Sequence, residues 1–131
     1  MKRLIATLAL ATVALAAAAC SSTDADTRTP ATSAGPVDPN VPVVVAKDMK
    51  FQTRDVVAPA GKAFKLTFEN RDGAPHNVAI YTDSSASKAL FQGEIFGGTA
   101  TKVYDVPALA AGTYFFRCDV HPDMTGTIVV K

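Results

Sequence analysis

Apolar and polar side chains alternate strictly in the segment Lys62–Glu69 (KAFKLTFE), and this pattern restricts the possible folds more than any other feature of the chain. Phe64, Leu66 and Phe68 lie on one face, and Lys65, Thr67 and Glu69 lie on the other. Successive side chains point to opposite faces only in an extended strand, so the segment predicts a strand buried on one face. Eight glycines and eight prolines supply many turns, which favours a strand-rich domain over a helical bundle.

Further strand patterns recur between turn signals in the rest of residues 41–131. The expected strands cover 41–46 (an edge strand, because of Pro42), 62–69, 76–82 and 99–106, with others beginning at Gly112 and Thr125. Val56 and Val57 lead into a turn, and 83–98 loses its period, which indicates a loop or a short helical turn. About seven short strands without a long helix predict an all-β fold, a Greek-key β-sandwich.

Four potential soft metal ligands stand out in the sequence. Cys118, His121 and Met124 fall in one short run, FFRCDVHPDMTGTIVV, and His76 lies upstream in GAPHNVAIY. The chain has only two histidines, and both belong to this set. Two imidazoles and a thiolate with a weak axial thioether form the donor set of blue copper sites, whereas hard cations prefer oxygen. A β-sandwich gathers its loops at two ends, so the four residues can meet there.

Each of these residues also has an ordinary structural explanation. Cys118 is compatible with a buried structural thiol or with a disulfide to Cys20, and Met124 with core filling. His76 alone would fit a surface position. Zinc is an alternative metal for a Cys-His-His set, although structural zinc sites prefer four strong donors.

Two longer segments, NRDGAPHNVAIY and GTYFFRCDVHPDMTGTIVV, resemble the cupredoxins, the small blue copper proteins that include plastocyanin, amicyanin and pseudoazurin. The resemblance spans about residues 43–131, and the short spacing before Met124 is more similar to amicyanin and pseudoazurin than to plastocyanin. It implies one type 1 copper ion with His76, Cys118 and His121 as strong ligands and Met124 as a weak axial ligand.

The resemblance also implies supporting residues behind the ligands. The family places an Asn after the first histidine, and Asn77 matches it. We expect the Asn77 side chain to bond to the region of Asp119 or Thr125 and so to join the two ligand segments. Asp119 departs from the Ser or Thr often found after the cysteine, so this connection is expected to be arranged differently here.

The N-terminus predicts export. A basic start followed by apolar and small residues indicates a signal peptide over residues 1–19. Cys20 resembles a lipobox cysteine, which implies a membrane-anchored lipoprotein, although Ala17 stands where such motifs usually carry Leu. The same alanines fit ordinary signal peptidase, which would leave a secreted soluble protein. The run of about sixteen residues is shorter than the roughly 20 that span a bilayer. Residues 20–40 then form a polar tether, and 41–131 the folded domain.

Taken with the resemblance, these features predict an electron carrier rather than an enzyme, because no histidine remains for a catalytic copper. A net charge of +1 gives no reason to expect nucleic acid binding. The expected partner is a transient redox protein (a cytochrome, an oxidase or a copper enzyme), and the protein itself is expected to be a monomer. Two alternatives stay open: copper sequestration or delivery, and a cupredoxin-like module that binds no copper.

Overall fold

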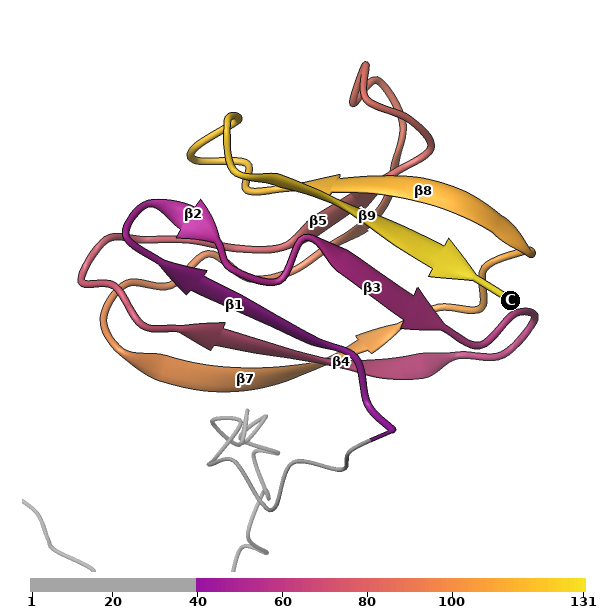
Figure 1. The fold of residues 1–131 in the computed structure, drawn as a ribbon, viewed down its shortest axis with the longest axis horizontal. Coiled ribbons are helices and arrows are strands. Elements are labelled where there is room, and N and C mark those ends of the chain that lie inside the picture. The colour runs from indigo at the N-terminus through magenta and orange to yellow at the C-terminus, as the bar shows by residue number, and fades with distance from the viewer. Residues whose placement is uncertain (1–39) are drawn as a thin grey trace, which may run out of the picture.

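The computed structural model of the chain describes residues 40–131; the expected signal peptide (1–19), lipidated Cys20 and tether up to residue 39 lie outside the described residues. Nine strands occur in this part of the chain and no helix (Figure 1). Their bounds are β1 Val43–Lys47, β2 Lys50–Phe51, β3 Asp55–Ala58, β4 Phe64–Asn70, β5 Ala79–Tyr81, β6 Ala89–Gln92, β7 Ala100–Val106, β8 Gly112–Arg117 and β9 Thr125–Val130. Residues 40–131 therefore contain no apolar helix of membrane-spanning length.

The strands form two layers (Figure 1). One sheet has the order β2-β1-β4-β7 and the other β3-β9-β8-β5-β6. Two of the pairings, β1 with β4 and β3 with β9, are parallel, and the remaining pairings are antiparallel. The expected all-β Greek-key sandwich is confirmed.

The core lies between the sheets and follows the alternation seen in the sequence. Phe64, Leu66 and Phe68 of β4 are all buried. Phe51 joins the two layers, because its ring packs 6.3 Å from that of Phe68 and 5.3 Å from that of Phe116. Each such side chain stabilises the fold by roughly 1.5–3 kcal/mol relative to an exposed position. This packing holds the strand ends, and the loops that continue from them, in a fixed arrangement.

The prediction that residues 41–46 form an edge strand is wrong about the place of this strand in the sheet. β1 lies between β2 and β4, and the two-residue strand β2 forms the edge. Pro42 precedes β1, so its missing N–H removes no bond of the ladder, while its carbonyl accepts a hydrogen bond from Thr67. A two-residue strand is too short to show a period in the sequence.

Three other segments also differ from the expectation. Residues 83–98 contain β6, which pairs with β5, and the segment around Val56 and Val57 is strand β3, which pairs with β9. The strand expected from residue 76 begins at Ala79, and His76 forms an isolated bridge with Phe96 instead. The pairing of β3 with β9 and that of His76 with Phe96 join residues distant in the sequence, and β6 is too short to show a clear period.

Gly126 fixes how closely β9 approaches its neighbours. A Cβ at this position would collide with the ring of Phe116 and lie 2.6 Å from the carbonyl oxygen of Arg54. The Arg54 carbonyl also accepts a hydrogen bond from the backbone N–H of Thr127 at 2.7 Å. The first residues of β9, which follow the Cys118–Met124 run directly, are therefore held against both β3 and β8.

Candidate metal centre

Three connections meet at one end of the sandwich. Figure 1 shows the β8–β9 loop, the β1–β2 turn and the β4–β5 connection together at the end away from the C-terminus. The β8–β9 loop carries Cys118, His121 and Met124. It is closed by two backbone hydrogen bonds, from Cys118 N to the Met124 carbonyl (3.0 Å) and from Met124 N to the His121 carbonyl (2.9 Å). These bonds hold the two ends of the loop side by side.

His76 reaches this end from the β4–β5 connection. Its backbone exchanges two hydrogen bonds with Phe96, each 3.1 Å long. The side chain of Asn70 donates to the Phe96 carbonyl and to that of Ala74. The irregular backbone around His76 is thus held by hydrogen bonds although it belongs to no strand, and the imidazole is completely buried.

Three donor atoms form a compact triangle. His76 Nδ1 and His121 Nδ1 lie 3.1 Å apart, and each lies 3.8 Å from Cys118 Sγ. A point at equal distance from all three atoms lies about 2.1 Å from each, within the range of about 2.0–2.3 Å over which imidazole nitrogen and thiolate bind an ion such as zinc. The triangle therefore fits one metal ion without any movement of the donors.

The chemistry of the donors suits a soft or borderline metal. Two imidazole nitrogens and one sulfur are the three donors, and Ca²⁺ or Mg²⁺ would need oxygen. Burial lowers the pKa of His76 below its ordinary value, against the opposing effect of its hydrogen bond with Asp72. A neutral imidazole keeps a nitrogen lone pair free for a metal, so His76 is prepared to act as a ligand.

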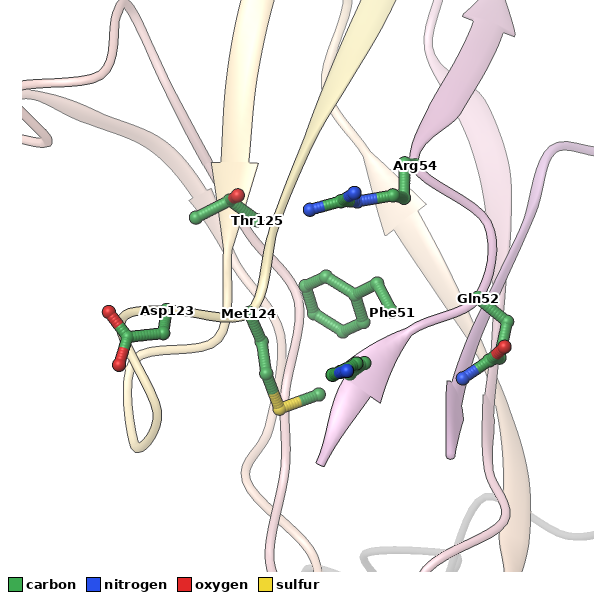
Figure 2. Close-up of a pocket in the computed structure, with 7 residues that line it drawn as sticks. Phe51, Gln52, Arg54, Asp123, Met124 and Thr125 are labelled. Carbon is green, nitrogen blue, oxygen red and sulfur yellow. The ribbon is translucent and has the colours of Figure 1, made fainter. Parts of the chain in front are cut away.

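Met124 is only 2% exposed and belongs to the same loop. Figure 2 shows it beside Phe51 in the lining of a cleft of about 350 Å³, which Arg54 and Asp123 also line. The cleft thus opens on the Met124 side of the loop. His121 lies on the other part of the loop and is partly exposed. The structure therefore brings His76, Cys118, His121 and Met124 to one end of the molecule.

Asn77 joins the two donor-bearing segments. Its side chain donates to Asp119 Oδ2 at 3.0 Å and accepts from the backbone N–H of Asp119 at 2.8 Å. It also donates to the carbonyl of Gly93 at 3.1 Å. The expected hydrogen bond between Asn77 and the region of Asp119 is present in the structure.

The carboxylate of Asp119 accepts further hydrogen bonds that the sequence did not reveal. Tyr81 donates its hydroxyl at 2.5 Å and Gln92 its amide at 3.2 Å. Arg117 Nε lies 3.7 Å from the same carboxylate, and its guanidinium covers the Tyr81 ring. Burial alone would raise the pKa of Asp119, but these donors and the charge of Arg117 outweigh it and lower the pKa. The residue after Cys118 therefore carries a negative charge.

Asp72 is a second residue that sequence reasoning missed. Its carboxylate lies 3.1 Å from His76 Nε2, the ring nitrogen outside the donor triangle. Burial alone would raise the pKa of Asp72, but hydrogen bonds from Met49, Asp48 and His76 outweigh it and lower the pKa. The only sequence signal was a carboxylate four residues before a candidate ligand.

Exposed apolar residues occur beside the partly exposed His121 and beside the segments that hold His76. Val120 and Pro122 flank it in the loop, and both are exposed. Pro75 is exposed next to His76, and Ile95 is exposed next to Phe96, the residue that bridges His76. This end of the molecule combines a buried donor triangle with a small apolar surface.

Comparison with known proteins agrees with this geometry. A profile of the cupredoxin-like domain matches residues 6–130. Amicyanin-alpha of Methylorubrum extorquens is 38% identical over 89 residues, which cover 68% of this chain and 70% of that protein. The crystal structure of amicyanin from Paracoccus versutus, 28% identical, matches 73% of this chain and 86% of that chain with a TM-score of 0.56. Reduced auracyanin from Roseiflexus castenholzii, 18% identical, has a similar fold, with a TM-score of 0.60 over 68% of this chain and 94% of that chain.

Proposed function

This chain belongs to the cupredoxin family, and we propose that His76, Cys118, His121 and Met124 bind its type 1 copper ion. It is a small blue copper protein that transfers electrons and is not an enzyme. The observation that carries the ligand assignment is the triangle of two Nδ1 atoms and one Sγ, whose size suits a bound metal ion. Met124 is assigned as the weak axial ligand because it is buried and closes the loop that carries Cys118 and His121.

Copper, when bound, supplies a reversible one-electron change. The protein's part is to hold the donors still, because fast electron transfer requires that little has to move. The Cys118–Met124 backbone bond and the Asn77–Asp119 pair hold the loop, and Asp72 orients the ring of His76. Such supporting bonds fix ring orientation and donor strength in metal sites.

His121 is the ligand through which we propose that electrons enter and leave. It is the one partly exposed member of the donor triangle, and Val120 and Pro122 form apolar surface beside it. A small apolar patch suits a transient redox partner, since such encounters bury little area and separate quickly. The proposed partner is a cytochrome, an oxidase or a copper enzyme. We also propose that the carrier itself is a monomer.

The protein is exported. We further propose that residues 1–19 are a signal peptide, that Cys20 is lipidated, and that residues 20–40 tether the domain 41–131 to the outer face of a membrane. The basic start, the apolar run and the Ala-Ala-Ala-Cys sequence support this proposal. Mass spectrometry of the mature protein would detect a diacylglyceryl group on Cys20, whereas an unmodified N-terminus would indicate a secreted soluble form.

The test of the copper site is a visible spectrum of the purified protein after addition of one equivalent of Cu(II), followed by ascorbate. An intense thiolate-to-copper band is expected, which bleaches on reduction and returns on oxidation. Cys118→Ser should abolish that band, because the band requires the copper–thiolate bond. A colourless complex in the unaltered protein would contradict the proposal and favour copper sequestration or delivery, or a zinc site.

A further inference from the structure

The Asp72 carboxylate joins two parts of the molecule that lie far apart in the sequence. Oδ1 accepts the backbone N–H of Asp48 at 2.8 Å, and Oδ2 accepts that of Met49 at 3.1 Å. The same Oδ2 lies 3.1 Å from Nε2 of His76. The backbone N–H of Asp72 donates to the side chain of Asn70 at 2.9 Å, which fixes the loop that carries Asp72. One carboxylate thus contacts both the β1–β2 turn and a copper ligand.

The β1–β2 turn depends on this contact. Asp48 and Met49 are the two central residues of a hairpin whose flanking residues, Lys47 and Lys50, are paired. Both have positive φ, 55° and 57°. Two-residue hairpin turns with positive φ at both central residues normally use Asn-Gly or Gly-Gly, because most other residues are strained at positive φ. A strained turn without glycine persists only when its surroundings hold it. Asp72 holds it by accepting both of its N–H groups.

The imidazole of His76 transmits the effect. Its Nδ1 faces the donor triangle and its Nε2 faces Asp72. A hydrogen bond to the carboxylate requires the proton on Nε2, which leaves the Nδ1 lone pair for copper. A ring also fixed by copper presents Nε2–H to Asp72 in one direction, whereas without copper only the Asp72 contact and the surrounding packing hold the ring.

We propose that Asp72 is a positioning residue that couples the copper centre to the conformation of the β1–β2 turn, so that copper binding at His76 orders the turn at Asp48 and Met49. This inference rests on the proposed function, in which His76 Nδ1 binds copper. Because coupling between two sites is reciprocal, a turn held in its native conformation favours the copper-bound form by the same factor. The carboxylate charge behind His76 also favours Cu(II) over Cu(I), so it lowers the reduction potential.

The experiment measures hydrogen exchange of the Asp48 and Met49 amides by NMR, in copper-free protein and in the Cu(I) form. In the unaltered protein, copper should slow exchange of both amides at least tenfold. In Asp72→Ala both amides should exchange rapidly, copper should no longer slow them, and the reduction potential should rise. Asp72→Asn keeps an acceptor oxygen without the charge. Its amide exchange rates and its reduction potential should lie between those of the unaltered protein and those of Asp72→Ala. Asp105→Ala, which removes an exposed carboxylate of β7, should behave like the unaltered protein.

A second measurement keeps the inference testable if Asp72→Ala folds poorly. Met49→Gly relieves the positive-φ strain without touching His76, so Asp72→Asn should cost less stability in the Met49→Gly background than alone. Two results would overturn the coupling. One is that the stability changes of Asp72→Asn and Met49→Gly add. The other is that copper leaves amide exchange unchanged in the unaltered protein although its Cu(II) form shows the blue band. Loss of the blue band in the unaltered protein would instead refute the proposed function.

Discussion

Asn77 and Asp119 exchange two hydrogen bonds across 42 positions of the sequence, one from the Asn77 side chain to the Asp119 carboxylate and one from the Asp119 backbone to the Asn77 side chain. Asn77 follows His76 directly, and Asp119 follows Cys118 directly. The pair therefore holds the segments of two proposed copper ligands together at a point next to the donor triangle. A connection of this kind limits how far the ligand loop moves when copper changes its charge.

Asn77→Ala should weaken this connection. The side chain is buried, and its loss leaves the backbone N–H of Asp119 without its partner, which costs about 1–3 kcal/mol. We expect a lower unfolding midpoint and a shifted copper absorption band. Ser87→Ala, at an exposed position, is the matched control. An unchanged midpoint together with an unchanged spectrum would mean that Asn77 plays no part in the site.

Asp119→Asn should raise the reduction potential. The Asp119 carboxylate is ionised, and Asp119 follows Cys118 directly in the sequence, so its negative charge near the proposed copper site favours Cu(II). Voltammetry of the copper-loaded variant measures the change. Asp83→Asn removes an equal charge from an exposed turn and should shift the potential much less. Equal shifts in the two variants would show that only net charge matters.

Met124→Leu should retain copper and raise the reduction potential. The substitution nearly conserves side-chain volume, so the buried site stays packed and the fold should tolerate it. Loss of a weak axial donor to Cu(II) then favours the reduced state. Visible spectroscopy and voltammetry are the measurements. If the spectrum and the potential both stay as in the unaltered protein, Met124 is a core residue and not an axial ligand.

Stability should fall at alkaline pH through Tyr104. Burial raises the pKa of this phenol above its ordinary value of about 10, and the charge of Glu94 adds to the shift. Above pH 10 the unfolded chain loses a phenol proton that the folded protein keeps. The free energy of unfolding therefore falls as pH rises, by about 1.4 kcal/mol per pH unit for one such group.

Denaturant unfolding of the unaltered protein and of Tyr104→Phe between pH 8 and 11 tests this expectation. The variant lacks the hydroxyl and its hydrogen bond to the Glu94 carbonyl, so it should be less stable near pH 8. Its stability should also decline less steeply above pH 10. Parallel curves for the two proteins would rule out Tyr104 as the group responsible.

Much of the fold and the metal centre was predictable from local features. The alternation of Phe64, Leu66 and Phe68 predicted a half-buried strand, because burial of one face imposes a period of two. Two histidines, one near Cys118 and one upstream, predicted a soft metal site because few other functions require this set. The hydrogen bond of Asn77 was predicted through the family resemblance.

Other elements had no local signal. β2 and β6 are short edge strands, and each forms because the strand beside it, β1 or β5, offers backbone groups for pairing. Tyr81 and Gln92 reach the Asp119 carboxylate only because β5, β6 and β8 are neighbours in one sheet. Neither residue has a neighbour in sequence that hints at this contact.

The sequence by itself determined the strand period, the copper-type donor set and the candidate export signal, because each of these depends on residue types at short spacing. Only the tertiary structure decided that Asp72 lies between the strained turn at Met49 and the imidazole of His76. Such a contact depends on where sheet packing leaves the ends of distant strands. Physical proximity of this kind is a property of the folded chain and not of any segment within it.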